Sequence, residues 1–129
     1  MKMIAVTLAL AMAFAAPAFA ADPVEGVWQT QIDHGAYAYV TFAPCGAALC
    51  GVISRTFNSD GEYRSPNIGR MLVIDMKPDG ENKYRGHVWR PSNDKVYIGK
   101  MTYGGNALKL RGCVAGGLLC SAQDWVQVQ

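Results

Sequence analysis

The stretch YAYVTFAPCGAALCGVI, residues 37–53, decides how the chain folds. Its first half alternates small or apolar residues with hydroxyl-bearing ones, a period of two that is typical of a β-strand buried on one face. Pro44 then removes a backbone donor and Gly46 permits a positive φ, so the chain must turn before a second β-rich run. The stretch therefore predicts a hairpin whose two cysteines, Cys45 and Cys50, lie close enough to be joined near its tip.

Similar strand patterns recur along the chain between turns rich in Gly, Pro, Asn and Asp. Eight strands are predicted, over residues 24–31, 36–42, 51–57, 70–76, 83–89, 95–103, 107–113 and 119–128. The longest connection, residues 58–69, consists of turn-forming residues and is expected to be a rim loop or lid. No stretch after residue 20 has a helical period of useful length. The pattern predicts an all-β fold, an eight-stranded antiparallel up-and-down barrel, with a two-sheet β-sandwich as the alternative.

The first twenty residues have the features of a signal peptide. Lys2 supplies a positive start, residues 4–14 are apolar, and small residues end at Ala20, where cleavage is expected. Residues 21–129 are then a single β-barrel domain in the periplasm or outside the cell. A membrane anchor is the alternative, but the apolar run is short for a membrane span, so no stable anchor is expected after cleavage.

Charge and cysteine content narrow the classes of partner. The formal net charge is +2 at pH 7 and falls by one unit when Lys2 is removed, which gives no electrostatic reason to expect nucleic acid as a partner. Four cysteines in an exported chain indicate two disulfides rather than a metal site. The sequence predicts no cofactor.

Two pairings of the cysteines are compatible with their spacing. Cys45 and Cys50 flank one Gly-containing turn, and Cys113 and Cys120 flank another, so local pairing is expected from proximity. Each small ring would stabilise the fold by about 2 kcal/mol, whereas a long-range Cys45–Cys113 link would contribute roughly 4 kcal/mol and remains the alternative. The spacing is not that of a Cys-x-x-Cys redox motif, and an oxidising compartment disfavours zinc ligation.

An ordered set of motifs extends over nearly the whole mature chain: Gly26-x-Trp28, Pro44-Cys45-Gly46-x-x-Leu49-Cys50-Gly51, Gly86, Trp89-Arg90-Pro91, Lys95-x-Tyr97, Leu110-Arg111-Gly112-Cys113, and Gln123 with Trp125. This set resembles the DUF2147 family of small exported bacterial proteins. The resemblance implies a lipocalin-like β-barrel in the periplasm or outside the cell. That family has no established function, so no catalytic residue is carried over.

The pair Gly26 and Trp28 is also similar to the lipocalin signature, in which the Trp closes the barrel floor and a late-strand Arg packs over it. The resemblance gives the second role to Arg111, through a cation–π contact. The chain is shorter than a typical lipocalin, and nothing at its C-terminus indicates the flanking helix of that family.

Candidate ligand-binding residues are aromatic or titratable side chains on the predicted strands and the long loop: Tyr63, His87, Trp89, Tyr97 and Tyr103. Aromatic side chains with a polar group can line a pocket, but they are also favoured in strands for packing alone. Ala36 and Ala38 would leave room inside a barrel if they face inward. Their direction stays open, because a one-residue slip in register exchanges the two faces of a strand.

Catalytic and metal-binding motifs are not apparent. The two histidines, His34 and His87, lack a recognisable third ligand, and no serine lies in a nucleophile elbow, so we expect neither an enzyme nor a metal site. The first functional hypothesis is a barrel that binds a small apolar or amphipathic ligand, such as a lipid or fatty acid, in a cavity of several hundred cubic ångströms. The alternative is a protein-interaction or inhibitor-like envelope module whose stapled loops present an apolar patch to an envelope protein: Ala47, Ala48, Leu49, Leu118 and Leu119.

Overall fold

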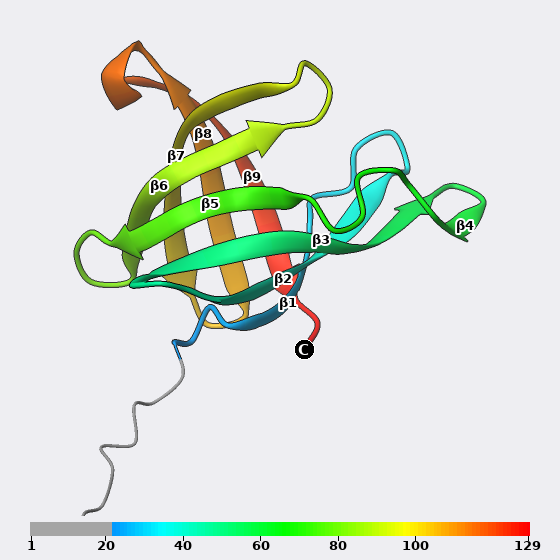
Figure 1. Cartoon of the computed structure of the whole chain (residues 1–129), viewed down its shortest axis with the longest axis horizontal. Helices are drawn as coiled ribbons and strands as arrows, with labels where there is room; N and C mark the ends of the chain where they lie inside the picture. Colours follow the sequence, from blue (N-terminus) through cyan, green and yellow to red (C-terminus); the bar gives the residue numbers. More distant parts are fainter. Residues whose placement is uncertain (1–21) are drawn as a thin grey trace, which may run out of the picture.

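A computed structural model describes residues 22–129 as one closed antiparallel sheet (Figure 1). Its strands are β1 (Gly26–Gln29), β2 (Tyr37–Cys45), β3 (Ala48–Asn58), β4 (Gly61–Tyr63), β5 (Met71–Pro78), β6 (Lys83–Arg90), β7 (Lys95–Gly104), β8 (Ala107–Val114) and β9 (Leu119–Gln127). A short 3-10 turn, η1 (Ala115–Gly117), joins β8 to β9. The expected signal peptide lies outside the described residues. No helix within the described part of the chain is long and apolar enough to span a membrane.

Eight of these strands form a ring in chain order. Each pairs with the next, and β1 closes the ring by pairing with β9 through Trp28↔Gln127 and Gln29↔Val126. The predicted eight-stranded up-and-down barrel is therefore confirmed, and the sandwich alternative is not adopted. Closure leaves no open edge on the ring, which removes a template for edge-to-edge aggregation.

The predicted loop over residues 58–69 is partly wrong, because it contains β4. The side-chain oxygen of Asn58 accepts a hydrogen bond from the Asp60 backbone N–H at 2.9 Å, and Gly61 has a φ of 112°. These two features make a tight turn, after which β4 pairs with the end of β3. β4 pairs with β3 alone and extends that hairpin beyond the barrel (Figure 1).

One half of the barrel is filled by side chains, and we call this half the closed end. Trp28 is fully buried there, its indole N–H donates to the Val24 carbonyl at 2.8 Å, and Tyr103 packs edge-on against it at 6.3 Å between ring centroids. Inward-facing residues of the other strands complete this core: Val40, Phe42, Val73, Met76, Met101 and Leu108. The apolar half of each period-two pattern is thus buried, as expected for a closed sheet.

A bulge in β5 shapes the wall next to this core. Asp75 has a φ of 49°, and the register of β5 against β6 shifts between Ile74 and Lys77. The carbonyl oxygens of Ile74 and Asp75 turn toward Gly86, and each lies 2.5 Å from the point where a Cβ on Gly86 would stand. Gly86 therefore makes room for the backbone of the bulge.

The two disulfides have the expected local pairing and lie at opposite ends of the barrel. Cys45–Cys50 joins β2 to β3, and Cys113–Cys120 joins β8 to β9. Successive turns of an up-and-down barrel alternate between its ends, and these two turns are separated by an odd number of ring strands. The five-residue apolar patch expected near the disulfides is therefore wrong: it is split between the two ends.

Burial agrees with this correction. Ala48 and Leu49 are only 8% and 6% exposed, whereas Leu118 and Leu119, next to η1, are 85% and 66% exposed. The large apolar side chains of this set that remain accessible, Leu118 and Leu119, thus belong to the β8–β9 connection, whereas Ala47 is exposed at the other end.

Candidate functional site

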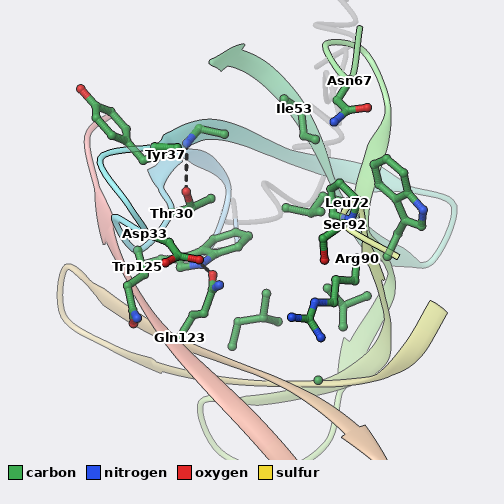
Figure 2. Close-up of a pocket in the computed structure, with 18 of the residues that line it drawn as sticks. Thr30, Asp33, Tyr37, Ile53, Asn67, Leu72, Arg90, Ser92, Gln123 and Trp125 are labelled. Carbon is green, nitrogen blue, oxygen red and sulfur yellow. Dashed lines mark hydrogen bonds between the residues drawn. The ribbon is translucent and has the colours of Figure 1, made fainter. Parts of the chain in front are cut away.

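The half of the barrel opposite the closed end is hollow. Its cavity has a volume of about 730 Å³. The residues that line it come from the β1–β2, β3–β5, β6–β7 and β8–β9 connections and from the adjoining strand ends, and Figure 2 shows 18 of them around the space they enclose. We call this half the open end.

Apolar side chains form the deeper wall of the cavity: Ala38, Ile53, Leu72, Val88, Leu110 and Trp125. Each belongs to a strand on which alternate residues face inward, so period-two patterning places them together. Trp125 is 1% exposed and lies between the cavity and the packed core. Ala36 and Ala38 both line the cavity, so the small side chains on β2 and just before it do leave room in the lumen.

Polar side chains gather toward the open end: Thr30, Asp33, Asn67, Arg90, Ser92 and Gln123. Two of them are held in place by hydrogen bonds. The hydroxyl of Thr30 accepts from the Ala38 backbone N–H at 2.9 Å, and the amide oxygen of Gln123 accepts from the Trp125 indole N–H at 3.0 Å (Figure 2). The site is therefore amphipathic, with an apolar interior below a polar entrance.

Arg90 and Tyr97 form a polar group on one side of this entrance. The Tyr97 hydroxyl accepts a hydrogen bond from the Asn93 side-chain amide at 2.7 Å. That bond, together with the positive charges of Arg90 and Lys95, lowers the pKa of Tyr97. Both Arg90 and Tyr97 line the cavity.

Three of the five predicted ligand-binding residues line the cavity: Tyr63, Trp89 and Tyr97. Tyr63 is on β4, the strand absent from the sequence prediction. The Trp89 ring lies under the Arg70 guanidinium, 3.7 Å from it, and its indole N–H donates to Asp94 at 2.8 Å. Trp89 is therefore fixed at the edge of the site, and its ring is already occupied on one face.

The other two predicted residues lie elsewhere. His87 is exposed on the outer face of β6, because it alternates with Gly86 and Val88, which face inward. Tyr103 faces inward but packs against Trp28 in the closed end, away from the cavity lining. Register places His87 on the outer face, and depth along the barrel places Tyr103 in the packed core, so neither residue lines the cavity.

Arg111 also differs from its expected role. It alternates with Leu110 and Gly112, which face inward, so it lies on the outer face of β8, where its guanidinium donates to the Thr102 hydroxyl at 3.3 Å. The arginines that stack on aromatic rings in residues 22–129 are Arg55 and Arg70. Trp28 is buried at the closed end without the contact that the lipocalin resemblance gave to Arg111.

A cluster of metal-ligand residue types occurs at the closed end, where Asp75 lies 3.9 Å from the sulfur of Cys45 and 3.8 Å from that of Cys50. The two sulfurs are bonded to each other, so neither is a thiolate that binds a metal. His34 pairs with Asp33 at 2.8 Å in an exposed turn, and His87 lies on the barrel wall.

Several cavity residues were missed from the sequence, notably Arg90, Ser92 and Gln123. For two of them, the sequence did contain a pattern that indicates an inward-facing side chain. Arg90 follows Val88 by two residues and Gln123 precedes Trp125 by two, so each shares the inward face of its strand with an apolar neighbour. Ser92 is in a turn, where no periodicity exists to reveal its direction.

Comparisons with known proteins agree with this fold. Residues 26–127 match a family described as an uncharacterized protein conserved in bacteria, DUF2147. Among solved structures, the chain is similar to protein HP1028 from the human pathogen Helicobacter pylori, which is described as belonging to the lipocalin family. The TM-score is 0.62 at 17% sequence identity, over 81% of this chain and 82% of that chain. No curated protein matches the chain.

At that identity the structural match establishes the barrel fold, and neither match points to an enzyme family. The family match covers most of the chain and includes every strand of the ring. This chain is a lipocalin-like β-barrel, and it belongs to the DUF2147 family.

Proposed function

We propose that this protein holds a small apolar or amphipathic molecule, such as a lipid or fatty acid, in the open end of its barrel. The observation that carries the proposal is the cavity of about 730 Å³. Small-molecule sites are typically about 300–1,000 Å³ and mostly apolar. An eight-stranded barrel has an interior that side chains can fill, as they do at the closed end, so a hollow half is a specific feature of this sequence.

Small residues are the physical reason for the space. Ala36, Ala38 and Gly112 occupy lining positions where larger side chains would project into the lumen. The apolar wall below them favours a hydrocarbon group, because burying it removes apolar surface from water. The polar entrance favours a ligand whose other end remains hydrogen-bonded.

We propose that the protein acts in the periplasm or outside the cell and without catalysis. The two disulfides support this location, because disulfides are typical of oxidising compartments, and so does the signal-like sequence of residues 1–20. No cofactor is proposed. The fold suits binding, because rigid strands present a preformed site that costs little free energy to order.

The test uses N-phenylnaphthylamine, a neutral dye whose fluorescence rises in apolar surroundings. Ala38→Phe places an aromatic ring in the cavity and should weaken dye binding by about tenfold or more, since the best-buried part of the site is lost. Ala43→Phe is the matched control, because Ala43 is exposed on the same strand and faces outward. Equal affinity of the two variants would refute the cavity as the binding site.

A second measurement addresses the natural ligand. Native mass spectrometry of protein purified from its own periplasm should show an added mass that disappears in Ala38→Phe but stays in Ala43→Phe. Absence of any bound species, together with no dye binding by the wild type, would overturn the proposed function.

A protein-interaction module is the second candidate. Leu118 and Leu119 favour it, because two neighbouring, largely exposed leucines next to the Cys113–Cys120 disulfide form a rigid apolar projection. Leu118→Ser should abolish capture of an envelope protein and leave dye binding unchanged, because Leu118, unlike Leu119, does not line the cavity. Capture that persists in the Ser variant would exclude this projection as the interface.

A further inference from the structure

The cavity wall contains an arginine in a position that the apolar character of the site does not explain. Arg90 is the last residue of β6 and follows the inward-facing Val88 by two residues, so its side chain starts from the inner face. Figure 2 shows it extending into the space that Trp125 and Gln123 border on the other side. A guanidinium always carries its charge, so the polar entrance has a fixed positive end.

Arg90 has no carboxylate partner within the described residues. The ion pairs of residues 22–129 are made by His34, Arg55, Arg70 and Lys109, and Arg90 takes part in none of them. Arg70, which is nearby in the fold, is held by Trp89 and Asp94 instead. The Arg90 guanidinium is exposed and no carboxylate of residues 22–129 engages it, so it can bind an acidic group at the entrance of the cavity.

Tyr97 adds a second donor next to it. Its oxygen already accepts from Asn93, so its hydroxyl hydrogen is directed elsewhere, and no protein acceptor for that hydrogen occurs among the described residues. Arg90 and Tyr97 lie on adjacent strands near the same end of the barrel. Together they present N–H and O–H donors to one region of the entrance.

The acidic residue at the entrance is less suited to bind a ligand head group. Asp33 lies on the opposite side of the cavity in Figure 2, its side chain is 74% exposed, and it is paired with His34 at 2.8 Å. Arg90 is exposed as well, so the difference between the two groups is that Asp33 is already paired with His34 whereas Arg90 has no carboxylate partner in the described part of the chain. A negative group on the ligand thus finds an unpaired partner, whereas a positive group does not.

We infer that the ligand is a single-chain amphiphile ending in a carboxylate, which Arg90 binds as an ion pair and Tyr97 supports as a hydrogen-bond donor, with the hydrocarbon chain against the apolar wall. The inference rests on the proposed function, which requires only that the cavity bind an apolar group. A carboxylate matches the planar fork of an arginine in two parallel hydrogen bonds.

The experiment compares dodecanoic acid with dodecan-1-ol, which has the same chain without the charge, as competitors of N-phenylnaphthylamine at neutral pH. Wild-type protein should bind the acid about tenfold more tightly than the alcohol, as expected for a hydrogen bond to a charged group. Arg90→Met should remove this preference and leave the affinity for the alcohol unchanged. Arg90→Lys should keep part of the preference, because the charge stays while the fork is lost.

Arg85→Met is the matched control, because Arg85 is exposed on the outer face of the same strand and its removal changes the net charge equally. It should retain the wild-type preference for the acid. Thermal unfolding by circular dichroism checks that each variant folds, and the wild-type ratio of acid to alcohol affinity tests the inference even if Arg90→Met does not fold.

The outcomes separate the two proposals. Equal wild-type affinity for acid and alcohol, or a preference that survives in Arg90→Met, overturns the role of Arg90 while the cavity remains a binding site. Failure of the dye and both competitors to bind the wild type overturns the proposed function and this inference with it.

Discussion

Because of the bulge in β5, we predict that replacing Gly86 by a residue with a Cβ lowers the free energy of unfolding of the barrel. A Cβ at this position would stand 2.5 Å from the carbonyl oxygens of both Ile74 and Asp75. These are backbone atoms of a paired strand, so they cannot rotate away as a flexible side chain would. Gly86→Ala must therefore displace β5 or β6, and overpacking of this kind costs about 1–3 kcal/mol or more.

Gly104 supplies the comparison. It is also a strand glycine, but a Cβ there would meet no atom within 4 Å. Gly104→Ala should raise the free energy of unfolding by about 0.5–1 kcal/mol, because alanine loses less backbone entropy on folding. The two variants should thus differ by about 2–4 kcal/mol, a large share of the about 5–15 kcal/mol that stabilises a domain.

Urea unfolding followed by circular dichroism measures this difference. With a slope of about 1–3 kcal/mol per molar urea, the midpoint of Gly86→Ala should lie about 1 M or more below that of Gly104→Ala. Dye binding should be unchanged in both, since neither glycine lines the cavity. Equal midpoints, or a Gly86→Ala midpoint above that of the wild type, would refute the steric argument.

Three further predictions concern the closed end and the β8–β9 staple. Replacing Cys113 and Cys120 by Ser should lower the free energy of unfolding by about 2 kcal/mol or more, measured by urea unfolding against the wild type with both disulfides formed; no loss would show that the ring adds nothing. Trp28→Phe removes the hydrogen bond to a carbonyl and part of the packing in the closed end, so it should cost about 1–3 kcal/mol while dye affinity stays the same; a loss of dye binding would contradict the separation of the two ends. Burial and the Asp22 carboxylate raise the pKa of Tyr84, so the folded state keeps this proton longer than the unfolded state, and stability falls as the pH rises above about 10. Tyr84→Phe should therefore be less stable than the wild type at neutral pH and approach it at high pH; a constant difference in urea midpoint would contradict this linkage.

Much of the fold could be predicted from the residues alone. Alternation on the strands and the turn residues between them specified an up-and-down barrel, because side chains alternate faces and hairpin turns allow only antiparallel neighbours. The spacing of the cysteines around glycine-containing turns favoured the two disulfides. β4 was not predicted, because its three residues are too few to show the alternation of a strand.

The candidate site was predictable only in part. The inward direction of Ala38 and the outward direction of His87 depend on register, and the bulge between Tyr39 and Val40 and the one at Asp75 shift register without a sequence signal that we recognised. The sequence also did not show how far along the barrel each inward-facing side chain lies. Tyr97 and Tyr103 face the same interior, yet one lines the cavity and the other packs on Trp28.

Hydrophobic periodicity, turn chemistry and cysteine spacing are local properties, so the amino-acid sequence was enough to predict a closed antiparallel sheet with disulfides at two local turns. The packing of one half of the barrel, the hollow in the other half and the direction of Arg90 into that hollow became visible only in the folded molecule. That outcome depends on which side chains from different strands reach the same level of the barrel. It is set by the registers of all eight strands acting together, and no single stretch of sequence contains it.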